Sequence, residues 1–309
     1  MTHGQERWIG VDIGGTKVAA AVVTSTGEVI ESVRAATPAA GKAAVLDTTV
    51  ALIDQLRAEH TVDGIGVGAP GIIDRAAGRV LFASDILPGW MGAEVRGELE
   101  ARTSLPVTVD NDVRAMAHGE NMIGVGYGRS SVLFVSIGTG IGGALSVNGE
   151  LRHGAHGTAG ELAHLLVPAS GAIGCGCGRI DHLEAVASGP AMAAEYASRA
   201  GVSVQPLQKV VSLMHSGDPI ARAVITDAGE LLGRVLAGVA TAFDPEVIVI
   251  GGGAAQIGPD LLSPLVAAFR LEAMRPIADT AILPAHLGTD APLVGAALLA
   301  AATRTEVSR

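Results

Sequence analysis

Aromatic residues are scarce in this sequence of 309 residues, where 2 Trp, 2 Tyr and 4 Phe make up 3% of the chain. Hydrophobic residues still account for 49% of the chain, which excludes intrinsic disorder as the main state. The interior must therefore be built from Ala, Val, Ile and Leu. At roughly 150 residues per domain the length predicts about two domains, which excludes a lone peptide-binding module.

Basic residues are also in short supply, because 21 Lys and Arg stand against 31 Asp and Glu and give a formal net charge of -10. This charge repels nucleic acid and anionic lipid, so we expect neither nucleic acid nor a membrane as partner. No apolar run approaches the roughly 20 residues that span a bilayer. Gln5, Glu6 and Arg7 lie where a signal peptide needs an apolar core, so we expect a cytoplasmic protein.

Cysteine is limited to Cys175 and Cys177, and the single residue between them makes an ordinary disulfide a poor fit. Two cysteines alone would be interpreted as simple buried thiols. His164 and His182 flank the pair within a loop-rich span, and Cys and His are the ligands that zinc prefers. A Cys2His2 structural zinc site is therefore the better hypothesis.

The two common nucleotide-binding motifs are missing. Gly41-Lys42 is followed by Ala43, which lacks the hydroxyl of a P-loop. The glycine-rich turn at 138–143 is followed by a predicted strand and an Asn148-Gly149 hairpin, whereas a Rossmann site needs a helix there.

Three glycine-rich turns follow predicted strands instead. Glycine lets backbone N–H groups approach phosphate oxygens closely, so two such turns facing one another can hold a polyphosphate. A tight hairpin explains any single turn equally well, but it explains all three less well. The candidate phosphate-binding residues are Asp12, Gly14, Gly15, Thr16 and Lys17 in the first turn, Gly138, Thr139, Gly140 and Gly142 in the second, and Gly252 and Gly253 in the third.

The strand pattern is repeated along the chain. Strands are expected at 8–12, 18–23 and 29–33, and the same order of strand, glycine turn and strand returns from 132 to 147. Both copies place a hydroxyl or acidic residue two positions before the first glycine of the turn, which favours an internal duplication over two unrelated hairpins. We expect one copy in each domain.

The remaining pattern alternates helices and strands, which predicts an α/β protein. Helical spacing is expected at 44–59, at 218–242 and from 292 to 302, with buried strands at 64–68 and 247–250. We predict a small N-terminal domain of residues 1–112 completed by the C-terminal helix 292–309. The larger domain then spans residues 113–291.

Asp110, Asn111 and Asp112 close an apolar strand and open a helical stretch, and open α/β sheets bind ligands at such strand ends. Helix capping explains one of the three residues but not all of them. A carboxylate there can accept the proton of a substrate hydroxyl, as phosphoryl transfer requires. The neighbouring Asn can orient that hydroxyl.

Taken together, these residues resemble the ROK sugar kinases (repressor, open reading frame, kinase) over nearly the whole chain. Each motif is modest by itself, but their order and spacing are highly specific. The resemblance rests on 12–17, 68–71 with Asp74, 87–90, 111–112, 138–143, 157–164, Cys175-x-Cys177-Gly178 and 244–253. It implies the actin-like, ribonuclease-H-like ATPase fold, with two domains and a cleft between them.

The resemblance also implies a function, which is the ATP-dependent phosphorylation of a hexose hydroxyl with glucokinase activity as the first expectation. Asp112 is then the catalytic base, and Asp12 faces a hydrated Mg²⁺. The first two glycine turns contact the ATP phosphates and the third lies near the adenosine. The implied sugar-binding residues are Asn111, Glu161, His164, Glu184, Asp85 and Gly68. The implied cofactors are ATP, Mg²⁺ and structural Zn²⁺, and the implied assembly is a homodimer.

Two positions depart from the family pattern. His182 stands where the zinc motif normally has a third cysteine, and Asp85-Ile86 stands where an asparagine often contacts the sugar. The sequence does not decide among glucose, N-acetylglucosamine, mannose, fructose and allose, and polyphosphate stays open as a donor.

Two other functions are open to a protein with these motifs. A sugar-sensing repressor of this family carries a helix-turn-helix before the first glycine turn, whereas 11 residues precede Asp12 here. A non-catalytic sugar-binding protein has no need of a base, yet Asp112, Glu161, His164 and Glu184 are all present. Both comparisons favour the enzyme.

Overall fold

A computed structural model of the chain describes residues 6–84, 87–168 and 171–307. The chain forms two compact units, each described here by itself. The first comprises Met1–Gly128, Gly149–Ala159 and Ala285–Arg309, and the second comprises Arg129–Asn148 and Gly160–Pro284. Among the described residues, no helix combines the length and the apolar character that crossing a membrane requires.

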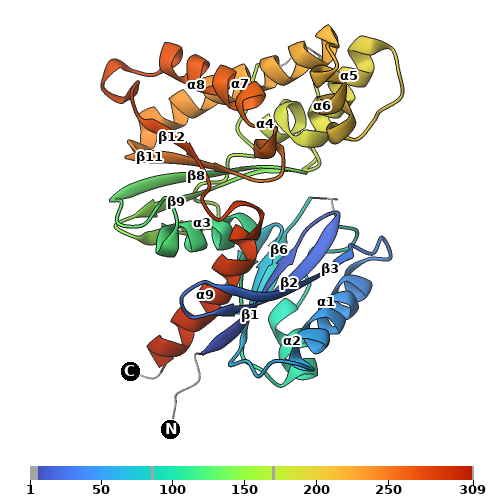
Figure 1. Cartoon of the computed structure of the whole chain (residues 1–309), viewed down its shortest axis with the longest axis vertical. Helices are drawn as coiled ribbons and strands as arrows, with labels where there is room; N and C mark the ends of the chain where they lie inside the picture. The colour runs from blue at the N-terminus through green and yellow to red at the C-terminus, as the bar shows by residue number, and fades with distance from the viewer. Residues whose placement is uncertain (1–5, 85–86, 169–170, 308–309) are drawn as a thin grey trace. The chain divides into compact units, whose positions relative to one another are not determined.

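The first unit is built on a five-stranded sheet of order β3-β2-β1-β4-β7 (Figure 1). Strands β1, β2 and β3, which the sequence predicts as strands, are antiparallel, whereas β1, β4 and β7 run parallel. A separate hairpin joins β5 to β6. The strands of this unit are β1 (Arg7–Ile13), β2 (Lys17–Thr24), β3 (Val29–Ala36), β4 (Ile65–Ala69), β5 (Ile72–Asp74), β6 (Arg79–Phe82) and β7 (Val107–Asn111).

Helices cover both faces of this sheet, which explains why β2 is apolar along nearly its whole length. Alternate residues of a strand point to opposite faces. Val18, Ala20 and Val22 pack in one cluster with α1 (Lys42–Arg57), while Ala19, Ala21 and Val23 pack with α9 (Ala291–Val307). The other helices of the unit are α2 (Val95–Thr103) and α3 (Asp112–Ile123).

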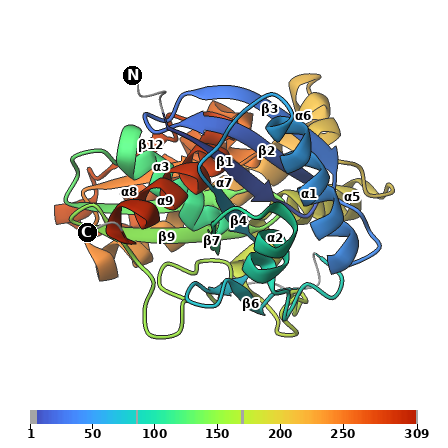
Figure 2. The ribbon, with the colours of Figure 1, turned by 90° about the horizontal axis from the view of Figure 1, so that it is seen from below.

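Helix α9 approaches its neighbours so closely that only glycine fits at the contacts. A Cβ on Gly10 of β1 or Gly66 of β4 would overlap the carbonyl groups of α9. A Cβ on Gly295 of α9 would overlap the carbonyl oxygen of Ala115 in α3. Figure 2 shows α3 and α9 side by side. The helix expected from residue 292 thus packs onto the N-terminal sheet.

The predicted division after Asp112 differs from the two compact units. Helix α3 lies in the first unit, which continues to Gly128. The physical reason is the close backbone contact of α3 with α9 at Gly119 and Gly295, two residues that are far apart in the sequence. Whether the two units behave as separate domains stays a prediction.

The second five-stranded sheet repeats the strand order of the first, because its strands follow one another as β10-β9-β8-β11-β12. Strands β8 and β9 form an antiparallel hairpin, and β8, β11 and β12 run parallel. This matching order is what the predicted duplication requires. The strands of the second unit are β8 (Ser131–Ile137), β9 (Ile141–Val147), β11 (Val247–Gly251) and β12 (Ala281–Pro284), and the edge strand β10 (Glu150–Arg152) belongs to the segment Gly149–Ala159 that is counted with the first unit.

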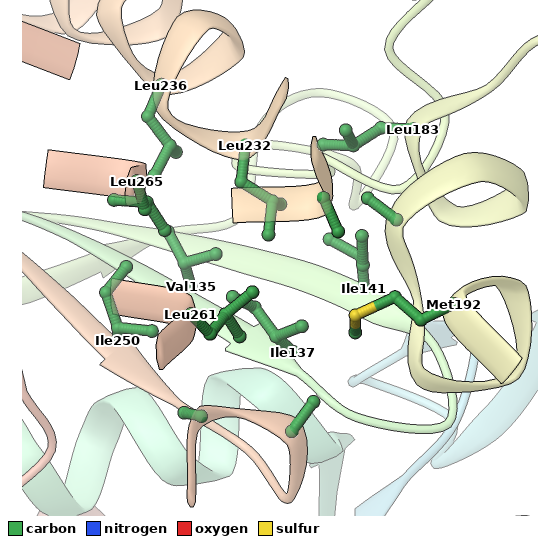
Figure 3. Packing of buried hydrophobic residues seen from close by; sticks show 14 of the residues in the cluster. Val135, Ile137, Ile141, Leu183, Met192, Leu232, Leu236, Ile250, Leu261 and Leu265 are labelled. Carbon is green, nitrogen blue, oxygen red and sulfur yellow. The ribbon is translucent and has the colours of Figure 1, made fainter. Parts of the chain in front are cut away.

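Helices α7 (Pro219–Phe243) and α8 (Pro259–Glu272) supply much of the core of this unit. Leu232 and Leu236 of α7 point toward residues of α8 and of the sheet (Figure 3), in one cluster with Val135 and Ile250. Asp218 caps α7 by accepting hydrogen bonds from two backbone N–H groups. The remaining helices are α4 (Leu183–Ala187), α5 (Gly189–Ala200) and α6 (Leu207–His215).

Candidate functional site

The carboxyl ends of three parallel strands place the first group of candidate residues at one edge of the first sheet. Asp12 at the end of β1 pairs with Gly68 of β4, and Gly68 pairs in turn with Asp110 of β7. The added Cβ of a residue at Gly68 would lie 3.1 Å from the Cα of Asp112. The structure thus gathers Asp12, Gly68 and Asp112 as ligand-binding edges of α/β sheets do.

Asn111 caps helix α3 and also holds the carboxylate of Asp112. Its Oδ1 accepts hydrogen bonds from the N–H groups of Val113 and Arg114, at 3.0 and 3.2 Å. Its Nδ2 donates to the carbonyl oxygen of Gly71 at 3.1 Å and to Oδ1 of Asp112 at 2.9 Å. The N–H of Val113 donates to the same Asp112 oxygen at 3.0 Å. Two donors therefore fix the orientation of this carboxylate.

The pKa of Asp12 is shifted far from its ordinary value. Burial and, to a lesser extent, the negative charge of Asp112 together raise the pKa of Asp12 to about 7, against the opposing effect of the positive charge of Lys17. A nearby cation strongly stabilises the ionised form of such a carboxyl group, because the charge of the cation offsets both the cost of burial and the repulsion from the neighbouring carboxylate. The pair Asp12 and Asp112 therefore fits a hydrated divalent cation.

The first glycine of the turn between β1 and β2, Gly14, lies two residues after Asp12. The N–H of Gly14 donates to the carbonyl oxygen of Lys17 at 2.9 Å, which closes the turn between β1 and β2. Gly14 and Gly15 are half-buried, whereas Thr16 and Lys17 are exposed.

A buried charged cluster surrounds Asp110, the residue before Asn111, and the sequence analysis found this acid but missed its partners. The Asp110 carboxylate is fully buried and accepts hydrogen bonds from Nε2 of His153 at 3.0 Å and from the N–H of Asn111 at 2.8 Å. It also forms an ion pair with Nε of Arg75 at 2.9 Å. Burial raises its pKa, but the His153 hydrogen bond and the Arg75 charge outweigh burial, so the pKa lies below its ordinary value.

Arg114 extends this cluster to the segment that precedes Glu161. Its Nη1 lies 3.8 Å from Asp110, and its Nη2 donates to the carbonyl oxygens of Gly157 and Ala159. The only signal for the cluster in the sequence is an acidic residue at the end of an apolar strand. Its partners Arg75 and His153 are too distant in sequence for spacing to find them.

In the second unit, two of the glycine turns meet at one sheet edge. The turn 138–140 follows β8, and Gly252 and Gly253 follow β11, its parallel neighbour. Gly252 has a φ of +88°, a conformation that favours glycine. An added Cβ on Gly138 would lie 3.7 Å from the backbone nitrogen of Gly253. The glycines thus leave room for backbone N–H groups to approach a phosphate.

The four predicted metal ligands converge in the second unit, where their ligand atoms all lie within 4.8 Å of one another. Nδ1 of His164 lies 3.2 Å from Nδ1 of His182 and 3.7 Å from Sγ of Cys175, and Sγ of Cys177 lies 3.3 Å from Nδ1 of His182. Zinc bond lengths give tetrahedral edges of about 3.3 Å for N to N and about 3.6 Å for S to N. The donor set therefore fits a tetrahedral zinc ion.

The thiols also fit a cation electrostatically. Burial is the main cause that raises the pKa of the Cys175 thiol; the backbone N–H of Cys177 lowers it, but the Cys177 thiol raises it again, so the pKa lies above its ordinary value. A bound metal ion favours the thiolate and removes that penalty.

The acidic residues expected at the sugar lie beside this cluster in the chain. Glu161 is half-buried and follows Gly160, where a Cβ would lie 2.8 Å from the Cα of Ala144. Glu184 lies on α4 and its Oε2 accepts a hydrogen bond from the N–H of Ile141 at 3.0 Å. Asp85 lies outside the described residues.

Comparison with known proteins finds one family and several sugar kinases that are similar to this chain over nearly its whole length. The ROK family matches residues 8–303. The chain is 35% identical over 313 residues to the glucokinase of Halalkalibacterium halodurans, with 94% of each chain covered. It is 34% identical over 301 residues to the N-acetylmannosamine kinase of Yersinia pseudotuberculosis, with 96% of this chain and 98% of that one covered.

Among solved structures, the chain is similar to a ROK family glucokinase from Streptomyces griseus in complex with glucose and AMPPNP. The TM-score is 0.88 at 34% identity, and the match covers 96% of this chain and 99% of that one.

Proposed function

The chain belongs to the ROK family, and we propose that it transfers the γ-phosphoryl group of ATP to a hydroxyl group of a hexose. Its α/β structure has the actin-like ATPase fold that the sequence resemblance implies. The single observation that carries the proposal is the oriented carboxylate of Asp112 at the edge where Asp12 and Gly68 also lie. This arrangement suits a general base that accepts the proton of a substrate hydroxyl.

In this reaction, the sugar hydroxyl gives its proton to Asp112 as the sugar oxygen attacks the γ-phosphorus, and ADP leaves with the electrons of the broken bond. Asn111 keeps the Asp112 carboxylate in place through its Nδ2 hydrogen bond. Mg²⁺ supplies charge neutralisation on the phosphates, and Asp12 is the residue that would face the hydrated ion.

The glycine turns would bind the nucleotide. The first turn, with Gly14, Gly15, Thr16 and Lys17, and the second, with Gly138, Thr139, Gly140 and Gly142, offer backbone N–H groups to the phosphates. Gly252 and Gly253 would lie near the adenosine. The second and third turns share one sheet edge, which supports assigning both to one ligand.

Zn²⁺ is proposed as the structural metal of His164, Cys175, Cys177 and His182. The tetrahedral spacing of their ligand atoms supports this assignment. Zinc would hold the segment that presents His164 and the start of α4, and with them Glu161 and Glu184. These residues would bind the sugar hydroxyls together with Asn111 and Gly68, and Asp85 stays a predicted contributor.

Glucose is the first candidate for the hexose, because glucokinases of two organisms are 33–35% identical to this chain. N-acetylmannosamine is the second, because the kinase of Yersinia pseudotuberculosis is nearly as similar. The homodimer and the cytoplasmic location stay predictions. The two alternatives are a non-catalytic sugar-binding protein and a sugar-sensing regulator, and a ROK family transcriptional regulator is similar to this chain in fold, at 25% identity with a TM-score of 0.81.

The test is an assay of ADP release by the purified protein with Mg²⁺ and ATP across glucose, mannose, fructose, allose, N-acetylglucosamine and N-acetylmannosamine. We expect one sugar to give turnover far above the rest, with the sugar phosphate identified by mass spectrometry. A parallel arm replaces ATP by polyphosphate. Sugar binding without turnover from either donor would contradict the kinase and support the regulator or a non-catalytic binding protein.

A further inference from the structure

The phosphate-binding turn 138–140 is held at both ends by one short segment of the second unit, residues 182–189. At the end of the turn, the N–H of Ile141 donates to Oε2 of Glu184 at 3.0 Å. At its start, the carbonyl oxygen of Gly138 accepts a hydrogen bond from the N–H of Gly189 at 2.9 Å. The turn is thus clamped between Glu184 and Gly189, which are five residues apart.

The Gly189 contact is also sterically tight. A Cβ at position 189 would lie 2.9 Å from the Gly138 carbonyl oxygen, closer than real Cβ atoms come. The backbone of α5 therefore supports the turn directly. Glycine at this position allows that support.

The clamp is itself anchored at the metal cluster. Helix α4 begins directly after His182. The N–H groups of Leu183 and Glu184 donate to the carbonyl oxygens of Leu165 and Ala163, at 2.9 and 3.0 Å, on either side of His164. The segment that carries Glu184 is therefore hydrogen-bonded to the residues on either side of His164, and it directly follows His182.

Ile141 is 4% exposed, so its N–H group has little access to solvent if Glu184 releases it. An unpaired buried N–H is costly, and a carboxylate is a stronger acceptor than a neutral group. The hydrogen bond from Ile141 therefore constrains the shape of the adjoining turn, independently of any sugar.

We propose that Glu184 is a positioning residue for the nucleotide: its carboxylate holds Ile141 and thereby fixes the 138–140 turn in the form that receives the phosphates. This inference rests on the proposed function, because it takes the turn to bind ATP. It assigns Glu184 a second role beside the sugar contact that the family resemblance implies. The Gly189 hydrogen bond has the same effect at the other end of the turn.

The test measures the Kd of a non-hydrolysable ATP analogue with Mg²⁺ by calorimetry, with no sugar present. Glu184→Ala removes the acceptor, and we expect roughly tenfold weaker binding, the ratio that the loss of one such hydrogen bond gives. Glu184→Gln keeps an amide oxygen that can accept from Ile141, so its Kd should stay within about twofold of wild type. Glu230→Ala, at an exposed position of α7 in the same unit, is the matched control and should bind as wild type does.

Gly189→Ala tests the clamp without touching a proposed sugar ligand. Its Cβ should displace the Gly138 carbonyl, weaken binding of the analogue several-fold, and raise the KM for ATP with little change in the KM for the sugar. This variant also decides the question if Glu184→Ala fails to fold. Amide hydrogen exchange across 138–143 should be faster in both variants than in wild type.

Unchanged Kd values in folded Glu184→Ala and Gly189→Ala would overturn the inference and leave the proposed kinase intact. Equal weakening in Glu184→Gln and Glu184→Ala would also overturn it, because the acceptor would then not be what matters. A wild-type protein that binds no ATP analogue would overturn both the inference and the proposed function.

Discussion

Nδ2 of Asn111 donates a hydrogen bond to Oδ1 of Asp112 at 2.9 Å, so the residue that caps helix α3 also orients the carboxylate beside it. The amide of Asn111 uses its oxygen for the helix and its nitrogen for Asp112 and Gly71. Capping and the proposed catalysis are therefore combined in one side chain. The effect of Asn111 on stability and its effect on turnover can be separated by comparison with a helix cap that lies outside the candidate site.

Asn111→Ala should lower both stability and turnover. Loss of a cap costs about 1 kcal/mol, and turnover should fall at least about tenfold because Asp112 loses a donor that orients it. Asp218→Ala removes the cap of α7 together with the hydrogen bond from the Tyr196 hydroxyl, so as the control it should lose at least as much stability and keep nearly normal turnover. Denaturant unfolding and the ADP assay measure the two effects. Equal turnover in both variants would show that Asn111 acts only as a cap.

Asp12→Asn should stabilise the protein in a pH-dependent way when Mg²⁺ and nucleotide are absent. Between the ordinary carboxyl pKa of 3.8 and the raised value of about 7, the folded protein holds a proton that the unfolded chain releases. Stability therefore falls as pH rises through this window, by up to about 4 kcal/mol at roughly 1.4 kcal/mol per pKa unit. The variant removes this penalty, so its advantage over wild type should be large at pH 8 and small near pH 4.

Thermal unfolding across this pH range measures the effect, with Asp47→Asn as a control at an exposed carboxyl. Asp12→Asn should also bind Mg²⁺ and ATP more weakly than wild type at pH 8. A constant stability difference from pH 4 to pH 8 would contradict the raised pKa of Asp12.

Metal analysis of protein purified without added zinc should find about one zinc per chain. Cys177→Ser replaces a thiolate with a hydroxyl, a poor zinc ligand, and should lower affinity at least about tenfold. His182→Ser should do the same if the histidine takes the place of the family's third cysteine. His215→Ala, at an exposed histidine of α6, should keep full metal content. Wild-type protein without bound zinc would contradict the Cys2His2 assignment.

Gly295→Ala should destabilise the protein by about 1–3 kcal/mol, because its Cβ would overlap the Ala115 carbonyl between α9 and α3. Gly238→Ala is the matched control on α7, where a Cβ meets nothing within 4 Å. That variant should gain up to about 1 kcal/mol from helix propensity. Denaturant unfolding compares the two. Equal effects would mean that α3 and α9 are not in close contact.

Much of the fold could be predicted from the sequence because its signals are local. Strands at 8–12 and 18–23, the glycine turns between strands and the long helix before Asp244-Pro245 all follow from neighbouring residues, and the structure has each of them. The repeated strand order of the two sheets was likewise visible as a repeated pattern.

The rest depends on contacts between residues far apart in the chain. The place of α3 in the first unit depends on Gly119 and Gly295, which no local pattern links. The charge of Asp110 is balanced by Arg75 and His153 from two other segments, so the sequence showed the acid and not its partners. The metal ligands were predictable as a set because the four lie within one short span.

The central claim is that Asp112 is the base that deprotonates the sugar, and one experiment tests it most directly. Asp112→Asn is nearly isosteric, and it is compared with wild type in the ADP assay and in calorimetric sugar binding. We predict sugar binding within about threefold of wild type and turnover lowered by about 10²–10⁴-fold. Turnover within a few-fold of wild type, with sugar binding retained, would contradict the account and place the base on another residue.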